Sequence, residues 1–414
     1  MPQLAFLPWA TIHEPVTVGE FRIVPYGVAV QTGEIDAGLV DATSDILTAY
    51  EGHDRSVDRA REPLVHRVGR GVTEDLSVDE VVGVFAFREH LAFSALAARD
   101  FFGIRYLNSD NLRLIVQRFD PAGSGATMIV TRRRDGSSRN IVSAGRLRES
   151  RPIHLGVECD IRRDVDLGLA AALQATQTLG VDLRDRIGAM VRLFVGANTD
   201  DSSTSTHTEV IDTASIFNRL ADEWTVDKIV PVFARLLPSP DWDGSESSRG
   251  PRASTLLEAA RRHGESIRAR WLRDLIQLRH PYGHGMILIP TPRALWSEFE
   301  HLLIAAVVVP LAVKAFLRAH SLYTFTSADI AADRALDGLL LLEPPSPSDG
   351  HEDDDDVDEE QRRSRHKVRW REVWNIARIW PAIEIVAAIA EHELGEDAAP
   401  VSHQPDHTTG DISG

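Results

Sequence analysis

The stretch from Ala269 to Gly285 reads Ala-Arg-Trp-Leu-Arg-Asp-Leu-Ile-Gln-Leu-Arg-His-Pro-Tyr-Gly-His-Gly, and it suggests both a fold and a chemistry. Around it, apolar residues recur at steps of four, four and three, which predicts one buried face of a helix. These residues are Ile267, Trp271, Leu275 and Leu278. We expect Arg279 to close this helix, and His284 follows after four intervening residues. A guanidinium that can bind a phosphate and an imidazole that can move protons are thus expected about one turn apart.

The motif resembles the signature of the HEPN superfamily, in which an arginine, a polar residue, a few variable positions and a histidine lie on a small helical bundle. The matching residues are Arg279, His280 as the polar residue, and His284, and residues 281–283 form the variable part. The resemblance covers this motif and the helices around it, from about 200 to 320. Pro281 departs from the pattern, because a proline inside a helix removes a hydrogen-bond donor and bends the axis.

Many members of this superfamily are metal-independent endoribonucleases, so the resemblance implies RNA cleavage that leaves 2′,3′-cyclic phosphates and needs no cofactor. It implies that His284 acts as base or acid, that Arg279 stabilises the charge on the phosphorane, and that His280 orients the motif or contacts substrate. It also implies a homodimer whose cleft contains both copies of the motif. Relatives with an extra domain often act in anti-phage defence or as toxins, so a phage or host protein is an expected signal.

Other interpretations of the motif do not involve catalysis. Arg279 could form an ion pair with Asp274 or Glu298 while His284 caps a turn, and the chain would then be an inactive HEPN-like scaffold for dimerisation or ligand binding. A zinc site built on His280 and His284 is disfavoured, because the intervening proline and glycine break the helix that such a pair needs. The sequence also lacks the Gly-x-Ser-x-Gly elbow of a serine hydrolase.

The composition limits the class of protein. The chain has 414 residues, enough for two or three domains, and 45 Lys and Arg against 62 Asp and Glu give a net charge of −17. Bulk attraction to nucleic acid is therefore excluded, and an RNA contact needs a local patch. The single cysteine, Cys159, suits a reducing cytoplasm. The first residues do not resemble a secretory signal, and the apolar run from Leu302 to Val313 is shorter than a membrane span, so we expect a cytoplasmic, soluble protein.

The chain is expected to have an α+β fold, beginning with a mixed, β-rich sensing or regulatory domain over residues 1–155. Strand-like composition occurs at 21–26, 27–32, 112–119, 127–132 and 140–144. The fourth of these is expected to form hairpins with the third and with the fifth, the latter across an Asp-Gly turn. A capping box at Ser77 and Glu80 predicts a helix to about Phe102. The tip of the second hairpin carries four arginines that either contact RNA phosphates or form a solvated edge: Arg132, Arg133, Arg134 and Arg139.

Residues 160–342 have helical periodicity and form the expected HEPN-like domain. Helices are predicted over 167–179, 183–195, 209–224, 226–237, 293–320 and 327–342, in addition to the motif helix. Residues 343–366 combine prolines, an acidic run and the start of a basic stretch, so we expect a disordered linker. A tryptophan-rich helix over 367–396 follows, which either packs on the bundle or binds a partner, and 397–414 form a disordered tail.

Overall fold

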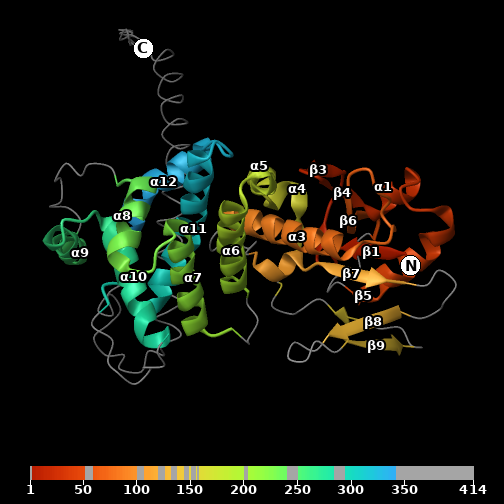
Figure 1. Cartoon of the computed structure of the whole chain (residues 1–414), viewed down its shortest axis with the longest axis horizontal. Helices are drawn as coiled ribbons and strands as arrows, with labels where there is room; N and C mark the ends of the chain where they lie inside the picture. Colours follow the sequence, from red (N-terminus) through yellow and green to blue (C-terminus); the bar gives the residue numbers. More distant parts are fainter. Residues whose placement is uncertain are drawn as a thin grey trace, which may run out of the picture.

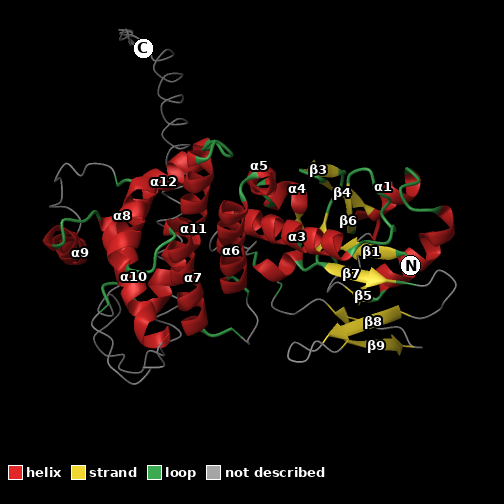
Figure 2. Ribbon diagram, viewed as in Figure 1, coloured by secondary structure: helices red, strands yellow, loops and turns green. Residues whose placement is uncertain are grey.

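The computed structural model describes residues 2–51, 59–99, 107–119, 126–131, 138–143, 149–150, 155, 158–199, 204–239, 250–283 and 294–341. Within these residues an antiparallel sheet near the N-terminus is followed by many helices, which is the α+β class expected from the sequence (Figure 2). The sheet lies at one end of the molecule and the later helices at the other (Figure 1).

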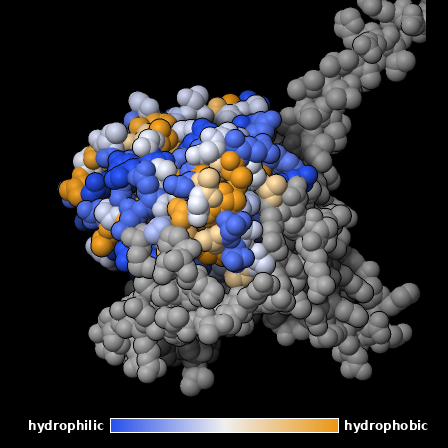
Figure 3. Space-filling view, turned by 90° about the vertical axis from the view of Figure 1, so that its right-hand side faces the viewer, coloured by the Kyte–Doolittle hydropathy of each residue, from blue (hydrophilic) through white to orange (hydrophobic). Residues whose placement is uncertain are grey.

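The main sheet has five strands in the order β3-β4-β6-β1-β7, and neighbouring strands pair antiparallel. The strands are β1 (Gln3–Phe6), β3 (Val16–Val18), β4 (Phe21–Pro25), β6 (Pro63–Arg67) and β7 (Ile115–Arg118). Because side chains alternate between the two faces of a strand, Leu4 and Phe6 enter one cluster and Ala5 enters another. The sheet is therefore covered on both faces. At this end of the molecule the described surface is hydrophilic with apolar patches (Figure 3).

Shorter pairs of strands extend this region. Strands β8 (Ala126–Thr131) and β9 (Ser138–Ser143) pair antiparallel, which confirms the expected pairing of residues 127–132 with residues 140–144. Two parallel pairs join distant segments: β2 (Ala10–Thr11) with β11 (Cys159–Asp160), and β5 (Tyr50–Glu51) with β10 (Glu149–Ser150). The other expected hairpin is wrong, because β7 pairs with β1 rather than with β8. The pairing of β7 with the distant strand β1 takes the place of the expected local hairpin.

One predicted strand is a helix. Residues 27–32 contain valines typical of strands, but α1 spans Tyr26–Gln31. Pro25 ends β4, and α1 then packs beside the 3-10 helix η2 (Arg59–Arg61). A Cβ atom at Gly27 would lie 2.8 Å from the Cβ of Ala60, so the glycine permits this close approach. Together with α2 (Val40–Thr48), α1 covers one face of the sheet.

The opposite face is covered by α3 (Val78–Ala98), which begins at the predicted capping box. The amide of Glu80 donates to the Ser77 hydroxyl, and the amide of Ser77 donates to the Glu80 carboxylate. Three further 3-10 helices are η1 (Ala37–Leu39), η3 (Ser109–Leu112) and η4 (Thr176–Thr178). The other helices are α4 (Ile161–Asp164), α5 (Leu167–Ala175), α6 (Val181–Ala197), α7 (Thr206–Ala221), α8 (Val226–Leu236), α9 (Gly250–Arg262), α10 (Ile267–Gly283), α11 (Glu298–Ala319) and α12 (Ser327–Leu340).

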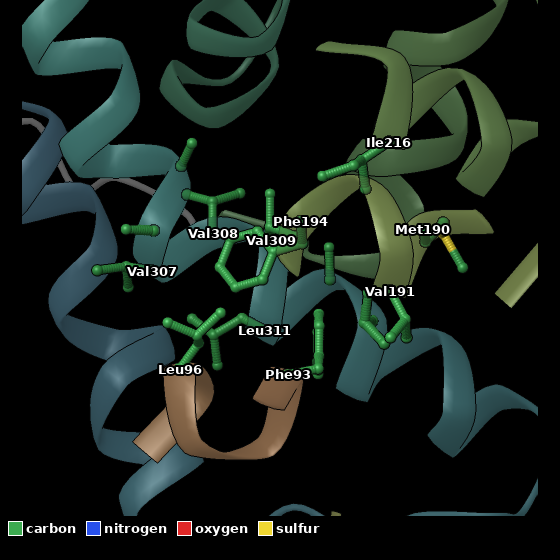
Figure 4. Packing of buried hydrophobic residues seen from close by; sticks show 14 of the residues in the cluster. Phe93, Leu96, Met190, Val191, Phe194, Ile216, Val307, Val308, Val309 and Leu311 are labelled. Atoms are coloured by element: carbon green, nitrogen blue, oxygen red, sulfur yellow. The ribbon is translucent and has the colours of Figure 1, made fainter. Parts of the chain in front are cut away.

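The centre of the helical region is α11, in which every residue from Ile304 to Leu317 is buried. Its valines and Leu311 meet Phe93 of α3, Phe194 of α6 and Ile216 of α7 (Figure 4). In the described part of the chain, α3 and α11 have the length and hydropathy of a membrane span. The apolar window of α11 is 78% buried inside the protein, which is typical of the core helix of a soluble protein.

The hydrophobic core crosses the expected domain boundary near residues 155–160. One cluster of buried residues extends from Ala5 and Ile23 on the sheet to Leu336 on α12. A buried polar junction reinforces it, since Lys314 Nζ lies 3.2 Å from Asp166 Oδ2 and 2.6 Å from Asp329 Oδ1. Burial and these two carboxylates raise the pKa of Tyr323, whose hydroxyl lies 2.9 Å from Asp329 Oδ2 and 3.3 Å from Asp166 Oδ2. The start of α5 is thereby joined to α11 and α12.

A buried arginine joins α10 to α12. The Arg268 guanidinium is 1% exposed, and its Nε and Nη1 atoms donate to Asp337 and Asp333 at 2.7 and 2.5 Å. Its Nη2 atom donates to the backbone oxygen of Asp333 at 2.6 Å. Because Asp337 is itself buried, loss of the guanidinium would leave a carboxylate without its counter-charge.

We expect Arg268→Met to lower the free energy of unfolding by about 3–5 kcal/mol, because it strands a buried carboxylate. Chemical denaturation followed by circular dichroism would measure the change. The control is Arg262→Met, which removes an exposed ion pair with Glu258 and should cost less than about 1 kcal/mol. Equal effects for the two variants would contradict the assigned role of Arg268.

We also expect a stability change that depends on pH and originates at His90. Burial, helped by Arg192, lowers the pKa of His90 from 6.5 to about 4, and its Nδ1 atom lies 2.8 Å from Gln174 Nε2. The unfolded chain takes up a proton that the folded chain excludes, so stability present above pH 6.5 is lost as the pH falls toward 4. The loss attributable to His90 reaches about 3 kcal/mol, since one pKa unit corresponds to ~1.4 kcal/mol.

Urea unfolding of the native chain and of His90→Gln at several pH values isolates this contribution from that of the carboxylates. The difference in unfolding free energy between the two proteins should change between pH 6.5 and 4 and stay constant above pH 7. A difference that is independent of pH over the whole range would show that His90 is not kept neutral by the fold.

Candidate functional site

Arg279 and the backbone of the four residues after it lie on α10, which is held in the core by the apolar residues identified from the sequence. Ile267, Trp271, Leu275 and Leu278 are all buried. The helix does not close at Arg279 as expected but continues to Gly283, with Pro281 in its last turn. Pro281 lacks the N–H that would bond to the carbonyl of Gln277, and the tertiary contacts of α10 outweigh that loss.

The guanidinium of Arg279 is half-buried and bonded to a neutral partner. Its Nη1 atom donates to the Asn218 Oδ1 atom on α7 at 2.9 Å. Burial lowers the pKa of Arg279, although not enough to discharge a guanidinium. Within the described residues, Arg279 forms no ion pair with Asp274 or Glu298, the two acids considered as partners in the non-catalytic interpretation. The positive charge is therefore oriented but not neutralised by those acids.

Asn218 itself is 4% exposed, and its Nδ2 atom has no hydrogen-bond partner among the described residues. A buried amide normally uses both its donor and its acceptor, because an unpaired donor costs about 1–3 kcal/mol. Within the described residues, the Asn218 side chain therefore uses its oxygen, which accepts from Arg279. The sequence pattern did not identify Asn218, since it lies 61 residues from Arg279 among apolar residues of a different helix.

The acid closest to the motif in sequence has a structural task. Asp274 Oδ2 accepts hydrogen bonds from the backbone amides of Leu295 and Trp296 and lies 3.1 Å from His301 Nε2. Asp274 is 5% exposed and His301 is fully buried between the rings of two tryptophans, Trp271 and Trp296. Asp274 therefore fixes the segment that leads into α11 against α10, beside the turn that carries Arg279.

The remaining predicted site residues are only partly covered by the structure. His284 lies outside the described residues, and so do Arg132, Arg133 and Arg134. The backbone of His280 belongs to α10 and that of Arg139 to β9, but their side chains are outside the described set. Arg279 is consequently the predicted catalytic residue whose surroundings can be examined.

The described part of the chain holds no cluster of three or more His, Cys, Asp or Glu side chains with the arrangement of a metal site. Arg279 retains further N–H donors beyond the one bound to Asn218. Such a group can bind an oxyanion with two parallel hydrogen bonds, as a carboxylate or phosphate requires. Arg279 therefore has the chemistry to bind an anion.

Comparison with known proteins adds no assignment, because no protein-family model, curated protein or solved structure matches the chain.

We expect Arg279 and Asn218 to be energetically coupled. Asn218→Leu should destabilise the protein by about 1.5–3 kcal/mol, because it removes a hydrogen bond to a charged group. The same change in an Arg279→Met background should cost distinctly less, and the difference between the two values is the coupling energy. Urea denaturation of the native protein, the two single variants and the double variant measures the four free energies of unfolding that this double-mutant cycle needs. Additive effects would mean that the amide does not hold the guanidinium.

Proposed function

We propose that this protein is a metal-independent endoribonuclease of the HEPN type that cuts RNA through Arg279, His280 and His284. The observation that supports this proposal is the environment of Arg279. A half-buried guanidinium whose described partner is an uncharged amide keeps its charge for an anionic ligand.

In the proposed reaction, a ribose 2′-hydroxyl loses its proton to a base and its oxygen attacks the adjacent phosphorus. The bond to the 5′-oxygen breaks as an acid protonates that oxygen, which leaves a 2′,3′-cyclic phosphate. His284 acts as the base or the acid. Arg279 donates to the non-bridging oxygens, where negative charge increases in the transition state, and Asn218 holds the guanidinium in that orientation. His280 orients the motif or contacts the RNA.

The proposed nuclease is cytoplasmic, in keeping with its single cysteine. It is also proposed to be a homodimer, because two copies of the motif would supply the charge and the acid–base pair that one cleft needs. The net charge of −17 means that RNA is held by local contacts rather than by the overall field. Arg132, Arg133, Arg134 and Arg139 are proposed to contribute such contacts. The β-rich region would sense a phage or host protein, in keeping with a role in antiviral defence or as a toxin.

We expect the purified protein to cleave mixed cellular RNA in EDTA, and Arg279→Ala and His284→Ala to lose at least ~100-fold in rate, the size of a typical acid–base or electrostatic contribution. Fragment ends should carry 2′,3′-cyclic phosphates. Arg262→Ala, an exposed arginine on α9, is the matched control and should cleave normally. Asn218→Asp should fold but cleave more slowly, because a carboxylate would neutralise Arg279.

Equal cleavage by the native protein and both motif variants would point to a contaminating nuclease. No cleavage by a folded dimer, with or without extract of infected cells as a source of activator, would favour the alternative, an inactive scaffold for dimerisation or ligand binding. Analytical ultracentrifugation of each variant would show whether it is folded and dimeric.

A further inference from the structure

An exposed tryptophan follows the last turn of α7. Trp224 is 71% exposed, more than any other aromatic side chain in the described part of the chain. The sequence predicted a helix as far as this residue, but α7 ends at Ala221, so a turn and not a helix presents the indole. A single apolar residue on a surface is normal. Trp224 differs from the other exposed apolar residues in what the turn and its neighbours place around it.

A Schellman motif fixes this turn. The amide of Glu223 donates to the main-chain oxygen of Asn218 at 3.2 Å, which is the longer of the two hydrogen bonds that define the motif. Asp222 adopts the left-handed φ of 57° that the motif requires. Arg186 of α6 donates to two further carbonyl groups at the end of α7. The backbone that carries Trp224 therefore starts from a fixed point.

Asn218 connects this turn to the candidate site. Its side-chain oxygen accepts a hydrogen bond from Arg279, and its main-chain oxygen accepts one from Glu223, the residue before Trp224. The bonds that join the Trp224 Cα atom to the Arg279 guanidinium therefore span at most roughly 20 Å. A single strand of a few nucleotides covers such a distance.

The charges around Trp224 favour an anionic ligand. The Arg219 guanidinium lies over the indole, 5.6 Å from the ring centroid, and within the described residues Arg219 forms no ion pair. The three acids nearest to Trp224 in sequence each have a cationic partner, at 3.8, 3.2 and 2.8 Å: Asp222 with Arg186, Glu223 with Lys228, and Asp227 with Arg273. Arg219 is thus a net positive charge beside the indole, in a chain whose overall charge is −17.

We propose that Trp224 is a stacking platform for an unpaired base of the RNA whose phosphate Arg279 binds. An indole with an arginine over one face can stack on a base with the other, and Arg219 is placed to contact a phosphate of the same strand. Bases within a duplex are already stacked on both sides, so the platform selects single-stranded RNA or the loop of a folded RNA. This inference rests on the proposed nuclease function and adds its substrate class.

Binding measured without cleavage tests the platform. The full chain with His284→Ala is the parent, and fluorescence anisotropy in EDTA follows a fluorescein-labelled uridine oligomer of about 12 nucleotides, a length typical of single-strand sites. Trp224→Ala should raise the Kd about 5- to 150-fold, which corresponds to the loss of one base–aromatic stack. Trp224→Phe should retain most of the affinity, because a smaller aromatic ring still stacks. An RNA duplex of the same length should bind more weakly than the single strand.

The matched control is Phe85→Ala, which removes an exposed aromatic ring from α3 and should bind RNA as tightly as the parent. Circular dichroism should show that Trp224→Ala is folded, as expected for a change at an exposed position. Rescue by Trp224→Phe then separates stacking from a general defect.

The possible outcomes distinguish the platform from the nuclease. A parent that binds no single-stranded RNA overturns both proposals. Equal Kd values for Trp224→Ala and its parent, measured on a protein that does bind RNA, overturn the platform alone. Dissociation of a dimer by Trp224→Ala in analytical ultracentrifugation, with the Kd for RNA unchanged, would show that the indole contacts a second copy of the chain and would also overturn the platform.

Discussion

The burial of α11 is the constraint on which the arrangement of the helices depends. From Ile304 to Leu317 it has no residue that faces water, so neighbours must cover it on all sides. The covering helices come from both parts of the chain, with α3 from the β-rich region and α6, α7, α8 and α12 from the helical region. The position of α10 follows from this packing, since His301 at the start of α11 contacts Asp274 of α10. Arg279 is placed on the rim of an apolar core.

Helices with strong local signals could be predicted from the sequence, and the strands could be predicted only in part. The Ser77 and Glu80 capping box and the apolar periodicity of α6, α8 and α10 are local properties that survive in the fold. The pairing of β1 with β7 and of β2 with β11 joins segments more than 100 residues apart, and no local pattern encodes such partners. The sequence predicts a strand where α1 forms because valine is common in strands, and the tertiary contacts that override this preference cannot be read from a local pattern.

The candidate site shows the same division. The arginine could be found because the spacing to His284 resembles a known signature and because α10 has a regular apolar face. Asn218 could not be found, since its hydrogen bond to Arg279 joins two helices across 61 residues of sequence, which only a three-dimensional arrangement reveals. Pro281 was expected to interrupt the helix before the motif ends, but α10 continues through it to Gly283.

The unbroken core that joins the sheet to the bundle affects how the whole protein responds to ligands. One cluster of buried side chains extends from Ala5 to Leu336, and Lys314 bridges Asp166 and Asp329, so we expect the sheet and the helices packed on it to unfold together. Any molecule that binds the β-rich region in the folded state alone therefore stabilises α10 and α11 as well. Shared packing thus links ligand binding at the sheet to the stability of the described helices.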